Sequence, residues 1–316
     1  MTDDNTQFEL FVPQDIPPDH RSGFVAVIGR PNVGKSTLLN AYLGQKLVIV
    51  SDKPQTTRKN LLGILTLPES QIVFVDTPGI HQPLHKLGEY MVKSALAALK
   101  DADVVLFLVD LSFPAGREDR LAAEALMDAK ANYTILVMNK ADLVAEDELA
   151  ERERAYISLA STNEQITISA ARGDNRDELL RRIIVALPLG PRYFPAEQVT
   201  DQQERFIAAE LIREQVLLHT RQEIPHSVAV VIDEFIERRE DLTYISATIL
   251  VEKDSQKGII IGEKGKMLKQ IGAGARAAVE QVLGHQAYLE LWVKVNKKWR
   301  TDEAELHRLG YNAPQD

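Results

Sequence analysis

Residues 29–36 read Gly29-Arg30-Pro31-Asn32-Val33-Gly34-Lys35-Ser36, which is the phosphate-binding pattern G-x-x-x-x-G-K-S. An apolar run, residues 24–28, precedes it, and residues 36–43 have the composition of an opening helix. In a strand–loop–helix context the glycines let backbone N–H groups surround phosphates, the lysine adds positive charge, and Ser36 can ligate Mg²⁺. A chance match in a glycine-bearing turn would lack the flanking strand and helix. The stretch, extended to Thr37, therefore predicts a site for a nucleoside triphosphate and Mg²⁺.

The length of 316 residues is enough for about two domains. The sequence has no cysteine, which excludes disulfides, thiolate catalysis and Cys-ligated zinc and suits a cytoplasmic protein. Residues 1–20 are acidic and proline-rich and do not resemble a signal peptide, so we expect a flexible extension. No run reaches the roughly 18 apolar residues that span a bilayer.

Residues 21–187 alternate apolar strand-like runs with helical stretches. The expected strands are 24–28, 61–67, 72–75, 104–109, 133–138 and 165–168. This alternation predicts an α/β domain whose mostly parallel sheet is covered by helices on both faces. Ligands of such sheets bind at the carboxyl ends of the strands, where the next motifs fall.

Asp76-Thr77-Pro78-Gly79 directly follows the strand-like run 72–75. An aspartate there can hold Mg²⁺ through water, and the N–H of Gly79 can approach a γ-phosphate. The polar segment 51–58, here called the switch loop, supplies Thr56 or Thr57 to Mg²⁺ and the γ-phosphate, and the sequence does not choose between them. We expect residues 80–86 to form a second switch.

Asn139-Lys140-Ala141-Asp142 follows the run 133–138, and Ser169-Ala170-Ala171 ends the run 165–168. The Asp142 carboxylate can accept both N–H groups on one edge of guanine, which adenine does not offer. A backbone N–H in residues 169–171 would meet the guanine carbonyl. Each motif alone is an ordinary polar loop, but in this order they predict GTP rather than ATP and argue against a metabolic P-loop kinase.

A proline-rich linker, residues 188–203, precedes a second domain over residues 204–316. Its pattern predicts a helix over 204–219, strands over 227–236, 242–252 and 286–296, and two helices between the last two strands. Gly262-Glu263-Lys264-Gly265 would form the turn between those helices. This order is that of a type II KH domain, whose G-x-x-G loop clamps the backbone of about four nucleotides.

Charge supports this reading of the turn. Residues 253–300 hold ten Lys and Arg against four Asp and Glu, a net of +6 in a chain of net charge −9. A solvated face is the alternative explanation. The expected RNA-binding residues are Gly258, Gly262, Glu263, Lys264, Gly265, Lys266 and Lys269, with Glu263 weakening phosphate affinity. We expect phosphate contacts from among Lys294, Lys297, Lys298 and Arg300, and packing roles for Trp292 and Trp299.

The motif set G-R-P-N-V-G-K-S, Q-T-T-R, D-T-P-G, N-K-A-D and I-S-A resembles the translation-factor-like class of small GTPases. Ile80 stands where Ras-like enzymes carry a water-orienting glutamine, so the resemblance implies slow hydrolysis of GTP to GDP. Related GTPases use an asparagine at the position of Asn32 to hold K⁺. The resemblance therefore implies the same role for Asn32. The expected catalytic residues are Lys35, Asn32, Thr57 and Gly79.

A GTPase domain followed by a KH domain resembles the bacterial Era family over residues 20–312, including P-R-Y-F-P, T-D-Q-Q-E-R-F and V-K-V-N-K-K-W-R. The resemblance implies a monomer that binds near the 3′ end of small-subunit ribosomal RNA and acts in small-subunit assembly and rRNA maturation. Peripheral association with the inner face of the cell membrane is also described for the family. The alternative is a binding module whose second domain docks on protein and whose first domain only senses nucleotide.

Overall fold

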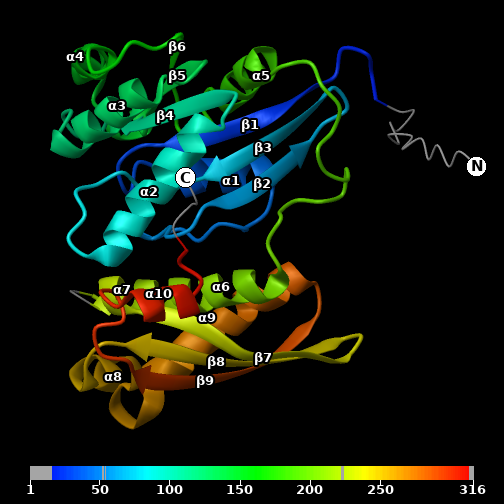
Figure 1. Cartoon of the computed structure of the whole chain (residues 1–316), viewed down its shortest axis with the longest axis vertical. Helices are drawn as coiled ribbons and strands as arrows, with labels where there is room; N and C mark the ends of the chain where they lie inside the picture. The colour runs from blue at the N-terminus through cyan, green and yellow to red at the C-terminus, as the bar shows by residue number, and fades with distance from the viewer. Residues whose placement is uncertain (1–15, 52, 54, 222–223, 313–316) are drawn as a thin grey trace, which may run out of the picture.

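The protein is described from a computed structural model that covers residues 16–51, 53, 55–221 and 224–312 (Figure 1). The larger part of the expected N-terminal extension lies outside these residues. Within them, no helix combines the length and apolarity that crossing a membrane requires. Figure 1 shows two domains stacked along the long axis of the molecule, with the chain passing from the upper to the lower one before α6.

A six-stranded sheet forms the centre of the N-terminal domain. Its strands are β1 (Arg21–Ile28), β2 (Leu61–Thr66), β3 (Ser70–Asp76), β4 (Val104–Asp110), β5 (Thr134–Asn139) and β6 (Glu164–Thr167). They lie in the order β2-β3-β1-β4-β5-β6, and only β2 runs antiparallel to its neighbour β3. The mostly parallel sheet predicted from the sequence is confirmed. All seven residues of β4 are buried, as expected for a central strand covered on both faces.

Helices cover both faces of this sheet. They are α1 (Lys35–Leu43), α2 (Lys86–Lys100), α3 (Arg117–Ala129), the 3₁₀ turn η1 (Ala141–Leu143), α4 (Glu146–Ile157) and α5 (Arg176–Ala186). Strand β1 shows how the faces separate, because Val25 and Val27 join the cluster under α1 and α5 whereas Ala26 and Ile28 join the cluster under α2, α3 and α4.

The C-terminal domain packs helices against a three-stranded sheet of order β7-β8-β9. Its elements are α6 (Glu204–His219), α7 (Ile224–Ser227), β7 (Ala229–Arg239), β8 (Leu242–Val251), α8 (Asp254–Ile261), η2 (Glu263–Gly265), α9 (Lys266–Leu283), β9 (Gln286–Val295) and α10 (Glu303–Arg308). Strand β9 runs parallel to β8, as a type II KH order requires. The strand expected from Ser227 begins instead at Ala229, because residues 224–227 form the helical turn α7, which tolerates Pro225 in its first turn.

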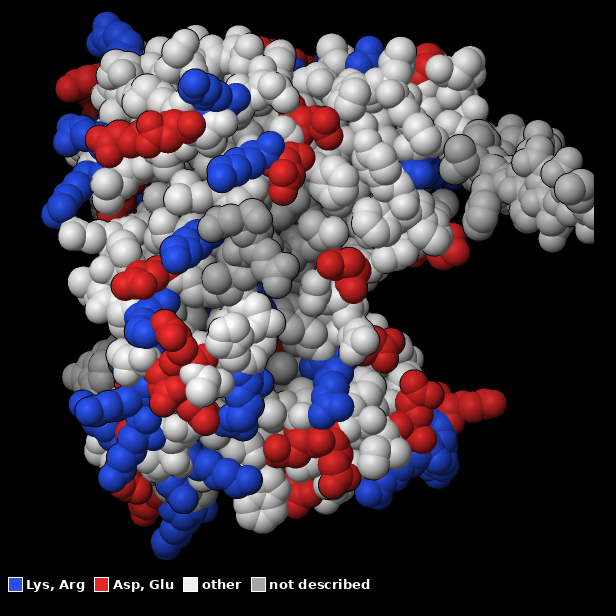
Figure 2. Space-filling view, viewed as in Figure 1, with Lys and Arg blue, Asp and Glu red and all other residues white. Residues whose placement is uncertain are grey.

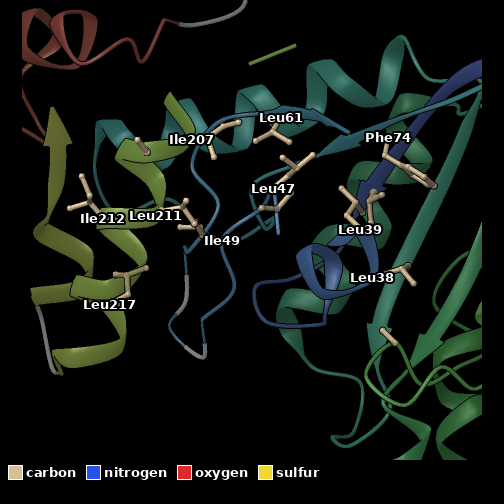
Figure 3. Packing of buried hydrophobic residues seen from close by; sticks show 14 of the residues in the cluster. Leu38, Leu39, Leu47, Ile49, Leu61, Phe74, Ile207, Leu211, Ile212 and Leu217 are labelled. Carbon is tan, nitrogen blue, oxygen red and sulfur yellow. The ribbon is translucent and has the colours of Figure 1, made fainter. Parts of the chain in front are cut away.

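One apolar core runs from the first domain into the second. Figure 3 shows Leu47 and Ile49, which precede the switch loop, lying between Leu39 of α1 and Leu211 of α6. Arg58 of the switch loop is 2% exposed and donates from Nη1 to the carbonyl of Val228 at 2.6 Å. The switch loop is therefore held between the two domains.

Trp299 forms a second contact between the domains. It is fully buried, and its indole Nε1 donates to the Ser227 carbonyl at 3.0 Å. Leu87 and Met91 of α2 belong to the same apolar cluster, so this residue of the C-terminal domain packs on the segment that follows the second switch. The packing role expected for Trp299 is what the structure shows.

Replacing Trp299 by alanine should destabilise the protein by about 3–5 kcal/mol, because it removes a fully buried aromatic side chain and its hydrogen bond. Urea unfolding monitored by circular dichroism measures the loss. Trp292→Ala is the matched control, since Trp292 is 55% exposed and its loss should change the free energy of unfolding by no more than about 0.5 kcal/mol. Equal losses in the two variants would contradict the assignment.

Candidate functional site

The loop of residues 29–34 joins β1 to α1 and places Lys35 at the start of the helix. Gly34 adopts a φ of 104°, and a Cβ there would lie 2.2 Å from Nδ2 of Asn139, so only glycine fits. The Lys35 ammonium donates to the carbonyls of Gly29 at 3.3 Å and Arg30 at 3.1 Å. Burial lowers the pKa of Lys35 to about 8, although Asp76 acts in the opposite direction. A phosphate beside this ammonium would favour its charged form.

Three oxygen-bearing side chains meet at the start of α1. The hydroxyl of Thr57 lies 3.2 Å from that of Ser36, and both donate to Oδ2 of Asp76, at 3.0 and 3.2 Å. Burial raises the pKa of Asp76 to about 6, opposed by Lys35. The Oδ1 atom of Asp76 is buried and has no hydrogen-bond partner among the described residues. Hard oxygen donors with an unused carboxylate oxygen suit Mg²⁺, which keeps water and substrate phosphate as its other ligands.

The two candidate threonines face different ways. The hydroxyl of Thr56 donates to the carbonyl of Lys53 at 2.6 Å, inside the switch loop, whereas that of Thr57 points to Ser36 and Asp76. The geometry therefore favours Thr57 over Thr56 as the ligand from this loop.

Asn139 ties the predicted guanine motifs to the phosphate loop. Its Nδ2 donates to the carbonyl of Val33 at 2.8 Å, and its Oδ1 accepts from the N–H of Ala170 at 2.9 Å. Asp142, in η1, lies 3.8 Å from the guanidinium of Arg172, with a side chain that is 12% exposed. The structure thus brings the segments 139–142 and 169–171 together beside the phosphate loop.

Asp110 and Asp119 are structural partners that the sequence motifs did not reveal. Asp110 is 1% exposed and pairs with Arg30 at 3.3 Å and Lys140 at 2.7 Å, while Asp119 pairs with Arg30 at 3.2 Å. Lys140 also donates to the carbonyl of Asn32 at 2.8 Å. Asp110 ends strand β4, so the rule that site residues follow parallel strands would have pointed to it.

A cavity of about 440 Å³ opens over the phosphate loop. Among the predicted residues it is lined by Pro31, Asn32, Gly34, Lys35, Ser36, Thr37, Thr56, Thr57, Gly79 and Lys140. The lining residues that were not predicted are Ile49, Val50, Ser51 and Gln55. The predicted residues outside the lining are Gly29, Arg30, Val33, Asp76, Thr77, Pro78, Ile80, Asn139, Ala141, Asp142, Ser169, Ala170 and Ala171. The volume is within the range of ligand pockets.

Ile80 points away from this cavity. It is 4% exposed and belongs to the apolar cluster under α2 and α3, while its N–H donates to the Gly29 carbonyl at 3.1 Å. An aliphatic side chain buried in that cluster has no polar atom with which to orient an attacking water.

In the C-terminal domain, Gly262 to Gly265 form a tight turn between α8 and α9. Gly262 has a φ of 71°, and a Cβ there would lie 2.6 Å from Cβ of Met267. Glu263, Lys264, Lys266 and Lys269 are exposed, and Gly258 is exposed on α8. A groove of about 520 Å³ continues from the turn, lined by Gly265, Leu268, Lys269, Gly272, Ala273, Arg276, Tyr288, Leu289 and Leu291.

Arg276 and Tyr288 extend this groove and were not predicted. Among the described residues, β9 pairs only with β8, and side chains of β9 line the groove together with residues of α9. Alternation along β9 could have indicated that these side chains line the groove, but only once the strand order was known.

Two expectations for the basic segment 253–300 need correction. Trp292 is 55% exposed rather than packed, because β9 directs Leu291 and Val293 toward the helices and Trp292 to the opposite face.

Arg300 is not part of an open basic edge, since it pairs with Glu252 at 2.5 Å and lies 3.3 Å from His85. Lys294, Lys297 and Lys298 are exposed. Figure 2 shows Lys and Arg side chains gathered over the α8 end of the lower domain.

Two protein families match separate parts of the chain. Residues 24–140 match the family described as 50S ribosome-binding GTPase, and residues 223–300 match the KH domain family. The chain is 50% identical over 293 residues to GTPase Era of Leuconostoc citreum (strain KM20), an alignment that covers 92% of this chain and 97% of that relative.

Two solved structures resemble the whole molecule. One is an Aquifex aeolicus Era variant bound to GDP·AlF4⁻, and the other is Era in complex with MgGDPNP and nucleotides 1506–1542 of 16S ribosomal RNA. Each is 39% identical to this chain with a TM-score of 0.87, over 92% of this chain and 99% of the other.

Asp142→Asn should weaken guanine-nucleotide binding at least about tenfold, because a hydrogen bond to a charged group contributes roughly 1.5–3 kcal/mol. Titration with a fluorescent GDP analogue measures the change. The control is Asp147→Asn, which makes the same charge change at an exposed position on α4. If both variants bind GDP as the unmodified protein does, Asp142 does not contact the base.

Proposed function

The chain belongs to the Era family of GTPases, and we propose that it is a GTP-hydrolysing switch that binds the 3′ end region of small-subunit ribosomal RNA. One observation carries this proposal. The chain has both a cavity over the phosphate loop and a groove in its KH domain, and the alignment in which it is 50% identical to an Era protein spans both domains. Its role is assembly of the small subunit and maturation of its RNA. The reducing cytoplasm fits the cysteine-free sequence, while the monomeric state and peripheral membrane association rest on the family resemblance alone.

GTP binds with its phosphates over residues 29–36 and its base against Asp142. Ser36, Thr57 and Asp76 hold Mg²⁺, which neutralises charge on the phosphates. Lys35 and the backbone N–H groups of the loop stabilise the charge that develops as water attacks the γ-phosphate in line. The N–H of Gly79, which lines the cavity, completes this set.

The missing water-orienting side chain at Ile80 directs attention to Asn32. Asn32 lines the cavity with a left-handed φ of 64°, and its carbonyl is fixed by Lys140. We assign to Asn32 the holding of K⁺ beside the phosphates, where the bound ion would supply positive charge to the transition state.

GTP hydrolysis should therefore run faster in KCl than in NaCl at equal ionic strength, by about tenfold if K⁺ stabilises the transition state by one good charge contact of ~1.4 kcal/mol. Release of phosphate at saturating GTP measures both rates. Asn32→Ala should remove the difference between the two salts. Equal rates for the unmodified protein would refute the role of K⁺.

RNA binds in the groove between α9 and β9, with its backbone against the turn 262–265. Gly262→Asp and Gly265→Asp each place a carboxylate at that turn and should weaken binding of an RNA of nucleotides 1506–1542 at least about tenfold, as electrostatic repulsion replaces backbone contact. Filter binding or fluorescence anisotropy measures the affinity.

Gly284→Asp is the matched control for Gly265→Asp, because both glycines have a left-handed φ, 77° and 74°, with open space for a side chain, and Gly284 ends the same helix away from the turn. It should retain full RNA affinity. If RNA affinity survives the substitutions at Gly262 and Gly265, the alternative stands, in which the second domain docks on protein and the first only senses nucleotide.

A further inference from the structure

A second cavity, of about 270 Å³, lies between the two domains. Arg58 and Lys59 line it from the first domain, Glu210 and Arg213 line it from α6, and Tyr311 closes it from the C-terminal segment. It shares no lining residue with the cavity over the phosphate loop. The structure therefore has a pocket that the GTP and RNA sites do not account for.

The lining is strongly cationic. It carries Arg58, Lys59, Arg205, Arg213 and Arg308 against one carboxylate, Glu210. Burial lowers the pKa of Arg58 and of Lys59, opposed by Tyr311 at Arg58 and by Glu210 at Lys59, and Arg213 adds a smaller repulsion to both. Of these cations only Arg58 and Arg213 are buried, while Arg308 is exposed and pairs with Glu305 at 2.7 Å. Two buried like charges beside a single carboxylate are unfavourable unless a further opposite charge joins them.

Two buried guanidinium groups keep an N–H without a partner. Arg58, 2% exposed, donates to the carbonyls of Pro225 and Val228, but its Nε has no acceptor among the described residues. Arg213, 1% exposed, donates to Glu210 and to the Thr56 carbonyl, but its Nη1 has none. Neither atom is accessible from the cavity, so these two unpaired N–H groups lie behind its wall and add to its positive charge rather than facing its interior.

We propose that this cavity binds a tetrahedral oxyanion, either free phosphate or the phosphate of a small monoester. Guanidinium groups suit such an anion because their planar set of N–H donors matches its oxygens. The volume is slightly below that of pockets for drug-sized ligands and accommodates a phosphate-sized group. Since Arg58 and Lys59 adjoin Thr57, a bound anion fastens the switch loop to α6.

The experiment titrates inorganic phosphate into the full chain saturated with Mg²⁺ and a non-hydrolysable GTP analogue, so that the phosphate loop is already filled. Isothermal titration calorimetry should show saturable binding at one site. Lys59→Gln and Arg205→Gln should each weaken that binding at least tenfold. Both side chains are only partly buried or exposed, so the variants should remain folded, which circular dichroism checks.

Lys86→Gln is the control, because it also removes one positive charge from the contact between the domains. Lys86 forms an exposed pair with Glu303 and does not line the cavity. It should bind phosphate as the unmodified protein does. A parallel titration with methyl phosphate, a monoester that the cavity is large enough to admit, identifies the source, since competition indicates that a monoester binds and its absence indicates the free ion. No saturable phosphate binding, or equal affinity in Lys59→Gln and the unmodified protein, would overturn the proposal.

Discussion

The guanidinium of Arg58 crosses from the first domain into the second and is the contact on which the position of the switch loop depends. It donates to backbone carbonyls at Pro225, His226 and Val228 and lies 5.7 Å from the ring of Trp299. Its neighbour Thr57 faces Asp76 at the start of α1. Because consecutive Cα atoms are 3.8 Å apart, one short segment is fixed at the nucleotide site and in the KH domain at once.

Helix α6 holds the same segment at further points. Glu214 accepts from the N–H of Val50 at 2.9 Å and from Lys46 at 2.6 Å, and Arg213 donates to the Thr56 carbonyl. The second switch is also attached, since Lys86 pairs with Glu303 at 2.5 Å and His85 lies 3.3 Å from Arg300. Both switches thus contact the domain that carries the RNA groove. Any change in that contact on nucleotide binding must be matched by a reciprocal effect of RNA on nucleotide affinity, because linkage between sites is symmetrical in free energy.

Local pattern was enough to predict most of the strands, α6 and the main motifs, although the helical turn α7 before β7 was missed. The apolar periodicities located the strands, and α6 occupies the predicted residues 204–219. Local sequence pattern could not predict the long-range contacts, because the carbonyls that accept hydrogen bonds from Arg58 lie about 170 residues away in sequence. The two tryptophans illustrate the same limit. Trp292 and Trp299 occur in one basic stretch. The pairing of β9 with β8 turns Trp292 to the solvent face, whereas Trp299 lies beyond the end of β9 and fills the domain contact.

The chemistry of this domain contact suits a surface that changes during a cycle. Arg58 and Arg213 meet backbone carbonyls, and Arg213 also pairs with Glu210, whose pKa Arg213 holds below its usual value against the opposing effect of burial. Separating a guanidinium from a carbonyl leaves two groups that water solvates well, whereas a contact built only from apolar surface would resist opening in proportion to its area. The excess of buried cations further limits the stability of the closed form. The Arg58 end of the switch loop is held in this way, yet can be released at a modest cost in free energy.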